Sequence, residues 1–312
     1  MRVTFIGAGA MGGLFGSLMT EAGLDVQLVD IWEEHVEMIK DKGLRIDCDG
    51  QIRHVNLDIY KDYRLTRPAD LVIVFVKGPQ TAEAASDAAE IIAPDGMVLT
   101  LQNGLGNADI LAKALDPEMV ITGTTSYGSM VLGPGSIRHA GIGPTVIGPW
   151  AGGDLNKVAV MAQILTKGSI ETEVKADVKA LVWNKLMVNV GINAIVALTH
   201  IKNGQLVDLE ITKELSRAAV EEGLAVAKAL GINVRKDAVE HCWWVAEETA
   251  KARASMGQDV DAKRQTEIGT INGAVVRLGK ELGIETPINF ALTALITTWQ
   301  NSYLKKLGGT YE

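Results

Sequence analysis

Cysteine is scarce in this chain of 312 residues, with only Cys48 and Cys242, one in each half. Neither thiol belongs to a CxxC pair or lies at metal-ligand spacing from other Cys or His residues. The sequence therefore predicts neither a disulfide framework nor a metal site. Two lone thiols fit a reducing compartment, so we expect a cytoplasmic protein.

Clustered positive charge is also missing. The chain has 30 Lys and Arg against 38 Asp and Glu, a net charge of −8, and no block of basic residues. Proteins that bind nucleic acid neutralise its phosphates with such blocks, so we expect no nucleic-acid partner.

Long apolar runs are absent as well, since no stretch of about 18 uninterrupted apolar residues occurs. The closest, residues 188–198, is interrupted by Asn189 and Asn193. Met1 and Arg2 precede an apolar stretch as in a signal peptide, but the glycines that follow fit a strand, a turn and a helix instead. The sequence therefore predicts no membrane span and no secretion.

The first half of the chain alternates strand and helix patterns. Residues 71–76 (LVIVFV) form an unbroken apolar run, which is typical of a strand buried on both faces of a parallel sheet. Further strands are predicted at residues 3–6, 25–30, 97–101 and 120–125, and helices at residues 12–22, 33–42 and 81–92. Short β-branched runs within the Gly- and Pro-rich residues 133–153 predict antiparallel strands at the edge of the sheet.

The second half has amphipathic helical patterns only. Four helices are predicted at residues 176–198, 206–230, 237–256 and 259–282. The sequence thus predicts an α/β protein, with an N-terminal Rossmann-type parallel-sheet domain over residues 1–174 and an all-helical C-terminal domain over residues 175–312. We expect the last residues, 303–312, to be frayed.

A GxGxxG motif lies directly after the first predicted strand, where the first predicted helix begins. It comprises Gly7, Ala8, Gly9, Ala10, Met11 and Gly12. In such a turn the first glycine permits a tight bend, the second lets the backbone approach a pyrophosphate, and the third allows close helix–strand packing. The helix N-terminus adds free N–H groups. This context predicts a dinucleotide site rather than an ordinary βα turn.

Asp30 ends the second predicted strand, where a carboxylate hydrogen-bonds the ribose 2′-OH of NAD. Residues 31–34 (IWEE) offer no cation for the 2′-phosphate of NADP, which the carboxylate would repel. The sequence therefore favours NAD(H) over NADP(H). A helix-capping role for Asp30 stays open.

Polar residues also mark the helical half. Lys185, Asn189 and Asn193 recur every four residues in an otherwise aliphatic helical pattern, so they share one helix face. This stripe indicates either a binding face or a hydrogen-bonded structural network. Glu267 lies in small, apolar surroundings on the last predicted helix, where a carboxylate must be paired, hydrogen-bonded or protonated. A surface or merely paired glutamate is the alternative.

Several short motifs follow one another between residue 1 and about residue 285. After the glycine motif come Val76-Lys77, Gln102-Asn103-Gly104, the WNKL segment at 183–186 with Asn189 and Asn193, Asn203-Gly204, Ser255-Met256 and Thr266-Glu267. In this order they resemble the ketopantoate reductase (2-dehydropantoate 2-reductase) family. The resemblance implies a Rossmann domain joined to a helical domain, with a 2-keto acid bound in the intervening cleft and reduced by hydride from a nicotinamide cofactor.

The resemblance also implies roles for individual residues. Lys185 is the implied general acid that protonates the developing alkoxide, and Glu267 orients either the lysine or a substrate hydroxyl. Beyond the glycine motif, the implied cofactor contacts are Asp30, Lys77 and Asn103, and the implied substrate contacts are Asn103, Asn189, Asn193, Asn203 and Ser255. The chemistry agrees, since burial lowers the ordinary lysine pKa of about 10.4 toward neutrality. An ionised Glu267 would raise it.

The leading substrate by resemblance is 2-dehydropantoate, reduced to pantoate as in pantothenate biosynthesis, or a related branched 2-keto acid. Two positions depart from the family pattern. Ala252 stands three residues before Ser255, where an asparagine is common, and Asp30 stands where NADPH-using members often have a basic residue. Whether the chain forms a homodimer is left open.

Two other functions stay open. A β-hydroxyacid dehydrogenase is similar in having a Rossmann domain, a helical domain and a lysine four residues before an asparagine. A non-catalytic NAD(H)-binding sensor is the third candidate, although such a protein would need neither Lys185 nor Glu267.

Overall fold

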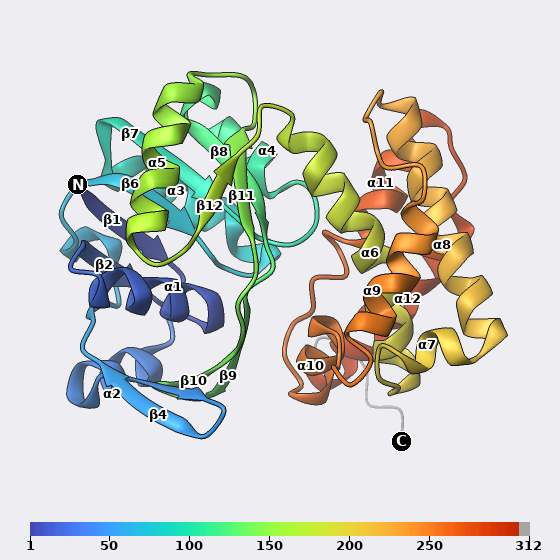
Figure 1. Ribbon diagram of the computed structural model, residues 1–312, viewed down its shortest axis with the longest axis horizontal. Coiled ribbons are helices and arrows are strands. Elements are labelled where there is room, and N and C mark those ends of the chain that lie inside the picture. Colours follow the sequence, from blue (N-terminus) through green and yellow to red (C-terminus); the bar gives the residue numbers. More distant parts are fainter. Residues whose placement is uncertain (306–312) are drawn as a thin grey trace. The chain divides into compact units, whose positions relative to one another are not determined.

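The computed structural model describes residues 1–305 and divides the chain into two compact units (Figure 1). The sheet unit comprises Met1–Gln102 and Asn107–Val178. The helical unit comprises the chain from Lys179 onward together with the short segment Asn103–Gly106, which precedes it in sequence.

An eight-stranded sheet forms the centre of the sheet unit. In spatial order its strands are β12 (Thr172–Val174), β11 (Thr145–Pro149), β8 (Val120–Thr125), β7 (Ile92–Thr100), β6 (Ala69–Val74), β1 (Arg2–Ile6), β2 (Asp25–Val29) and β5 (Asp58–Tyr60). Every neighbouring pair is parallel except β11 and β8, which are antiparallel. The predicted Rossmann-type parallel sheet is confirmed.

A second, four-stranded sheet was not predicted. Its order is β4 (Gln51–Val55), β3 (Leu44–Cys48), β10 (Ser136–Gly141) and β9 (Gly128–Gly133). The prediction that residues 133–153 supply antiparallel strands to the edge of the main sheet is therefore wrong for β10. The reason is that β10 pairs with β3, from Ser136 opposite Arg45 onward, and with β9, which takes it out of the main sheet. For β11 the antiparallel pairing is confirmed, but β12 and not β11 is the edge strand.

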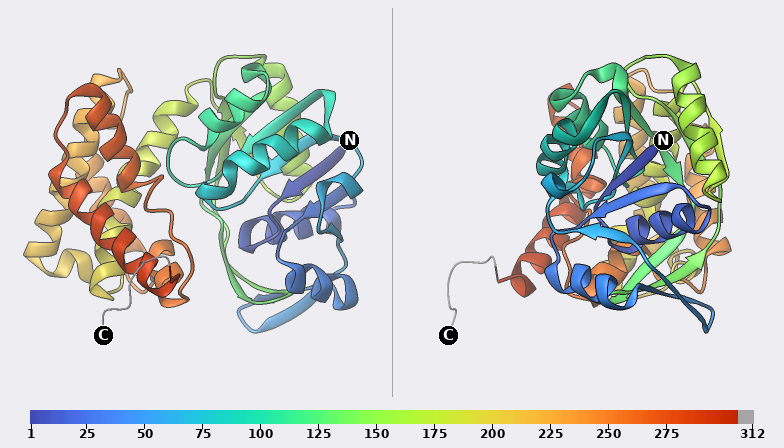
Figure 2. Two further views of the ribbon diagram at one scale, coloured as in Figure 1. Left: turned by 180° about the vertical axis from the view of Figure 1, so that it is seen from behind. Right: turned by 90° about the vertical axis from the view of Figure 1, so that its left-hand side faces the viewer.

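Helices cover both faces of the main sheet (Figure 1, Figure 2). Those of the sheet unit are α1 (Ala10–Glu21), α2 (Glu33–Lys42), α3 (Thr81–Ile91), α4 (Asn107–Ala114) and α5 (Leu155–Lys167), with short 3-10 helices η1 (Tyr63–Leu65), η2 (Gly78–Gln80) and η3 (Pro117–Met119). Alternate residues of β6 enter different cores. Leu71 and Ile73 pack with α1 and α5, whereas Val72 and Val74 pack with α3 and α4. This burial on both faces is what the LVIVFV run predicts.

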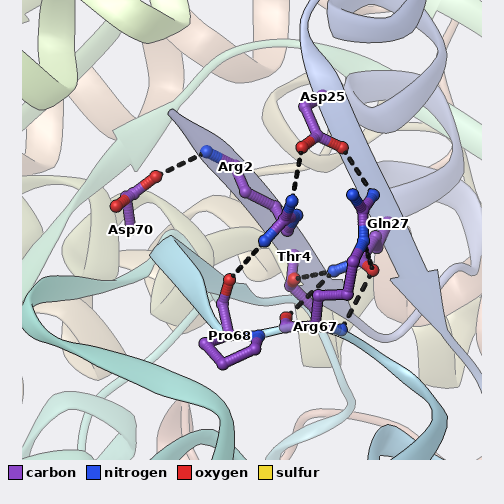
Figure 3. A network of polar contacts seen from close by, with 7 residues as sticks. All are labelled: Arg2, Thr4, Asp25, Gln27, Arg67, Pro68 and Asp70. Carbon is purple, nitrogen blue, oxygen red and sulfur yellow. Dashed lines mark hydrogen bonds and ion pairs between the residues drawn. The ribbon is translucent and has the colours of Figure 1, made fainter.

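A polar network fixes the register of three central strands at their amino-terminal ends (Figure 3). The Arg2 backbone N–H donates to Asp70 (2.6 Å), and the Arg2 guanidinium forms an ion pair with Asp25 (2.9 Å). The buried Gln27 amide donates to Thr4 Oγ1 (3.1 Å). Because β1 and β2 are held at this end, their opposite ends present the glycine motif and Asp30 side by side.

The helical unit contains α6 (Val178–Thr199), α7 (Gln205–Asp208), α8 (Glu210–Ala229), α9 (Ala238–Glu248), α10 (Ser255–Asp261), α11 (Asn272–Leu282) and α12 (Pro287–Tyr303). Its core forms around α6, including Leu186, Met187 and Val190. By length and composition α6 could cross a membrane, but 67% of its apolar window is buried inside the protein. Such burial is the mark of a core helix.

Three predicted helices are interrupted. The helix predicted at 237–256 ends at Glu248, and the next helix begins only at Ser255. The helix predicted at 259–282 ends at Asp261 and resumes at Asn272, so Glu267 lies in a turn and not on a helix. Gln300 holds the intervening segment, because its side-chain oxygen accepts from both the backbone N–H (2.9 Å) and the hydroxyl (2.8 Å) of Thr266. That N–H is then not bonded within a helix. Residues 206–230 likewise divide at Leu209, whose backbone is extended.

The expectation that residues 303–312 are frayed can be compared with the structure only at its start. Tyr303, expected to be frayed, ends α12 and its hydroxyl donates to the Arg264 carbonyl (2.7 Å). Residues 306–312 lie outside the described residues.

Candidate active site

The glycine motif forms a sharp turn between β1 and α1. Gly7 has a φ of +97°, and a Cβ there would lie 2.7 Å from the Phe75 carbonyl oxygen. A Cβ at Gly12 would lie 1.8 Å from the Gly7 carbonyl oxygen, so both positions exclude side chains. At Gly9, the N-cap residue of α1, an added Cβ would meet no atom within 4 Å. This open side at a helix N-terminus fits the pyrophosphate of a dinucleotide.

Asp30 follows β2 and faces this turn. Its Oδ2 accepts from the Ala8 N–H (2.7 Å), and its Oδ1 accepts from the Trp32 N–H (2.9 Å). The N-cap residue of α2 is Trp32, so Asp30 holds the connection before the helix rather than capping it. Each carboxylate oxygen keeps a further lone pair, so Asp30 can still accept from a ribose hydroxyl.

A pocket opens beside Asp30 and Gly7, and two acidic residues of α3, Glu83 and Asp87, also line it. Burial raises the pKa of Asp87, and the negative charges of Glu83 and Asp62 raise it further. Sequence reasoning missed these two residues. Their spacing of four on a helix that follows a buried strand could have indicated that they share one face.

Lys77 lies at the N-cap of η2, just beyond the end of β6. The end of β6 adjoins the glycine turn, because the Phe75 N–H donates to the Ile6 carbonyl (2.9 Å). Gln102 anchors the same segment to the end of β7 by donating to the Val76 carbonyl (2.6 Å). Lys77 is thus on the edge of the sheet that carries the glycine motif.

Lys185 lies on α6, one turn before Asn189, as the four-residue spacing predicts. The residue is partly exposed, yet dense packing around its ammonium lowers the pKa to about 8. Desolvation is the larger cause, and the negative charge of Glu267 opposes it. A lysine whose pKa is near neutrality can both hold and release a proton under ordinary conditions.

Glu267 is held by a segment from far away in the sequence. The Asn103 side-chain amide donates to Glu267 Oε2 (3.2 Å). Next to it, the Leu105 N–H donates to the Thr270 carbonyl (2.7 Å), and Gly104 packs so tightly that a Cβ would lie 2.2 Å from that carbonyl oxygen. These contacts explain why residues 103–106 belong to the helical unit. Within that unit Lys185, Glu267 and Asn103 therefore form one cluster.

Three of the predicted substrate-binding asparagines, Asn189, Asn193 and Asn203, have polar atoms without partners in the part of the chain that the structure describes. Among residues 1–305, the buried Nδ2 atoms of Asn189 and Asn193 and the Oδ1 atom of Asn203 accept or donate no hydrogen bond. Asn203 uses its Nδ2 to donate to Thr249 Oγ1 (2.9 Å). These atoms are therefore candidates for hydrogen bonds to a ligand. Ser255, the first residue of α10, is exposed.

Ala252 contacts Asn203 through its backbone only, and nothing in the structure explains the alanine at this position. Its backbone carbonyl accepts from the Asn203 N–H (3.0 Å). The adjacent Arg253, which sequence reasoning missed, donates to the carbonyls of Val196 and Ile201 and pairs with Asp261 (2.8 Å). Arg253 thereby closes the carboxyl end of α6, and nothing in the sequence pattern signalled this contact.

A sheet unit that fits a dinucleotide and a helical unit that carries an amine of lowered pKa are features of nicotinamide-dependent oxidoreductases. Comparison with known proteins narrows the class. The family described as "Ketopantoate reductase PanE/ApbA" matches residues 3–152, and its C-terminal counterpart matches residues 177–300. The chain belongs to the ketopantoate reductase family, and with it to the NAD(P)-dependent oxidoreductases.

Similar curated proteins cover nearly the whole chain. The 2-dehydropantoate 2-reductase of Halobacterium salinarum is 39% identical, over 95% of this chain and 98% of its own length. That of Archaeoglobus fulgidus is 36% identical, over 95% of this chain and 96% of its own length.

Solved structures of related proteins have the same fold. A D-mandelate dehydrogenase with NADH and anilino(oxo)acetate superposes with a TM-score of 0.91 at 29% identity, over 97% of this chain and all of the other. A PanE/ApbA family ketopantoate reductase from Ralstonia eutropha gives 0.89 at 32% identity, with the same coverage.

Proposed function

We propose that this protein reduces a 2-keto acid to the corresponding 2-hydroxy acid, with 2-dehydropantoate as the leading substrate and pantoate as the product. This reaction would place it in pantothenate biosynthesis in the cytoplasm. The names of the curated relatives support the substrate. The observation that carries the proposal is Lys185, with its pKa lowered to about 8, on the helix face that continues with the unpartnered amides of Asn189 and Asn193.

When bound, a nicotinamide cofactor supplies the hydride. Hydride addition builds negative charge on the carbonyl oxygen, which the Lys185 ammonium stabilises and then protonates. Glu267 keeps the ammonium charged by its own negative charge, and the Asn103 amide holds the Glu267 carboxylate in place. Lys185 is thus the proposed general acid, and Glu267 is the proposed orienting group.

The polarity of the unpartnered atoms supports a particular kind of substrate. Asn189 and Asn193 present N–H donors, which suit a carboxylate and the carbonyl oxygen beside it. Asn203 presents an acceptor, which suits a hydroxyl group. 2-Dehydropantoate has a hydroxyl group, whereas phenylglyoxylate, the 2-keto acid related to mandelate, has none. This acceptor therefore favours a hydroxylated keto acid over phenylglyoxylate. Ser255 is the remaining proposed contact.

For the cofactor we propose a preference for NAD(H) over NADP(H). Asp30, Glu83 and Asp87 gather around one pocket, where a 2′-phosphate would meet three carboxyl groups. Arg64 lies close enough to lower the pKa of Asp87, but it forms an ion pair with Asp62. Gly7 to Gly12 would hold the pyrophosphate, and Lys77 and Asn103 would lie toward the nicotinamide.

A panel of 2-keto acids and 3-hydroxy acids, assayed with NADH and NADPH by nicotinamide absorbance, tests the proposal. We expect turnover of 2-dehydropantoate with NADH and little with 3-hydroxy acids. Oxidation of 3-hydroxy acids as the main activity would instead assign a β-hydroxyacid dehydrogenase. Cofactor binding without turnover of any substrate would favour the sensor.

A further inference from the structure

The peptide groups around Ala8, in the middle of the glycine motif, are held from two sides. The Ala8 N–H donates to Asp30 Oδ2 (2.7 Å), and the Ala8 carbonyl lies 3.0 Å from Nε2 of His35. His35 belongs to α2 and is fully buried. A buried imidazole on this helix is therefore in direct contact with the proposed pyrophosphate-binding turn.

The contact of the second ring nitrogen, Nδ1, shows which nitrogen of His35 carries the hydrogen. The Gly135 N–H, in the turn between β9 and β10, donates to Nδ1 (3.0 Å). Since Nδ1 accepts, the ring hydrogen is on Nε2, which donates to the Ala8 carbonyl. Gly135 is itself anchored, because its carbonyl accepts from the Arg45 N–H (2.9 Å). Trp32 stacks on the ring with centroids 4.9 Å apart.

This contact has a consequence for Gly9. In a trans peptide the carbonyl of one residue and the N–H of the next point in opposite directions. The Ala8 carbonyl points at His35, so the Gly9 N–H points away from it. Within the glycine motif, Gly9 is also the glycine with open space around its Cα, and it is the N-cap of α1.

We propose that His35 is a positioning residue for the cofactor, which sets the Ala8–Gly9 peptide so that the Gly9 N–H is aimed at the pyrophosphate. The inference assumes the cofactor placement in the proposed function. It adds a residue outside the GxGxxG motif, on a different helix, that links this motif to the second sheet through Gly135. A neutral donor suits the task, because it orients the peptide without adding a charge.

The test measures binding of three ligands to the full-length protein, without any turnover. NADH and ADP-ribose contain a pyrophosphate, whereas adenosine does not. Titration calorimetry gives the first two dissociation constants, and ligand-observed NMR gives the third. We expect His35→Leu to weaken NADH and ADP-ribose binding about tenfold, which corresponds to about 1.4 kcal/mol. Adenosine binding should change less than twofold.

Conservative and matched variants separate positioning from general destabilisation. His35→Gln keeps an N–H donor and an oxygen acceptor at similar reach, so it should restore ADP-ribose affinity to within about threefold of the parent. Ile39→Ala, at a buried position one turn further along α2, should lower the melting temperature without a selective loss of ADP-ribose binding. Should His35→Leu fail to fold, His35→Asn, whose amide is too short for both contacts, takes its place.

Three results would overturn the inference. These are parent-like ADP-ribose binding by the folded His35→Leu or His35→Asn variant, an equal loss of adenosine and ADP-ribose binding, and the same selective loss in Ile39→Ala. A parent protein that binds neither NADH nor ADP-ribose would instead contradict the proposed cofactor site. The two failures are therefore distinguishable.

Discussion

The Asn103 side chain donates a hydrogen bond to Glu267 (Nδ2 to Oε2, 3.2 Å) across 164 positions of sequence. Asn103 directly follows Gln102, the last residue of the first sheet-unit segment, yet it belongs to the helical unit. The carboxylate proposed to act on Lys185 is thus fixed by a segment that immediately follows the parallel sheet. We therefore expect a substitution at Asn103 or Glu267 to change the electrostatic environment of the Lys185 ammonium.

The first prediction concerns the proton donor. Lys185→Ala should lower kcat by about 10²–10⁴-fold, because general acid catalysis contributes on that order. NADH affinity should stay within about twofold, since the dinucleotide turn is in the other unit. Steady-state kinetics and fluorescence titration of NADH measure the two effects. Lys179→Ala, an exposed lysine on the same helix, is the control; unchanged turnover in Lys185→Ala would remove the proposed acid.

The second prediction concerns pH dependence. Lys185 must be protonated to act as an acid, so kcat should fall as the pH rises through its pKa of about 8. Glu267 raises that pKa, and Glu267→Gln removes the negative charge. The alkaline limb of the kcat profile should therefore move to lower pH. A limb that stays in place or moves upward would contradict the assigned interaction.

The third prediction concerns stability in the helical unit. The Glu222 carboxylate accepts from the backbone N–H groups of Ile288 (2.8 Å) and Asn289 (2.9 Å), and from the Asn289 amide (2.7 Å). Glu222→Ala leaves the two backbone N–H donors at the start of α12 unpaired, while the Asn289 amide keeps its bond to the Ala219 carbonyl (2.9 Å). The two unpaired donors should cost about 2–3 kcal/mol of unfolding free energy. Urea denaturation measures this cost. Glu221→Ala, at an exposed neighbour, should change stability by less than about 0.5 kcal/mol.

The fourth prediction concerns cofactor choice. Asp87→Asn removes a negative charge from the pocket beside Asp30 and should tighten NADPH binding several-fold while leaving NADH binding nearly unchanged. Asp30→Ala should narrow the NADH preference too, but with weaker binding of both cofactors, since Asp30 also holds the Ala8 N–H. Competitive titrations with both cofactors measure these changes, with Glu90→Gln, exposed on the same helix, as control. A parent protein that prefers NADPH would refute the interpretation of the acidic pocket.

Local patterns predicted much of the fold for a physical reason. The LVIVFV run and the glycine motif are determined by neighbours in sequence, and the main sheet is parallel around them as expected. The same holds for the face shared by Lys185, Asn189 and Asn193, which needs only helical periodicity.

Other features depend on partners far away in sequence and carry no local signal. Gln300 holds the segment that interrupts the predicted helix before Glu267, and β3 draws β10 into a second sheet. His35 lies in an ordinary helical pattern, and only the fold brings it to the Ala8 carbonyl. Periodicity cannot predict such contacts, because they are set by tertiary structure.

The final prediction concerns the asparagine stripe. Asn193 is 5% exposed, and its Nδ2 has no partner among the described residues, so it should donate to the substrate when the keto acid binds. A hydrogen bond to a charged group contributes about 1.5–3 kcal/mol, so Asn193→Ala should raise KM for the keto acid at least about tenfold. Because the lost amide is uncharged, the alkaline limb of the kcat profile should not move. Asn184→Ala, also on α6, is the control, since the Asn184 side-chain oxygen already accepts from the Arg235 N–H (2.9 Å). An unchanged KM in Asn193→Ala, or an equal rise in Asn184→Ala, would mean that the stripe is part of the helix packing and not of the substrate site.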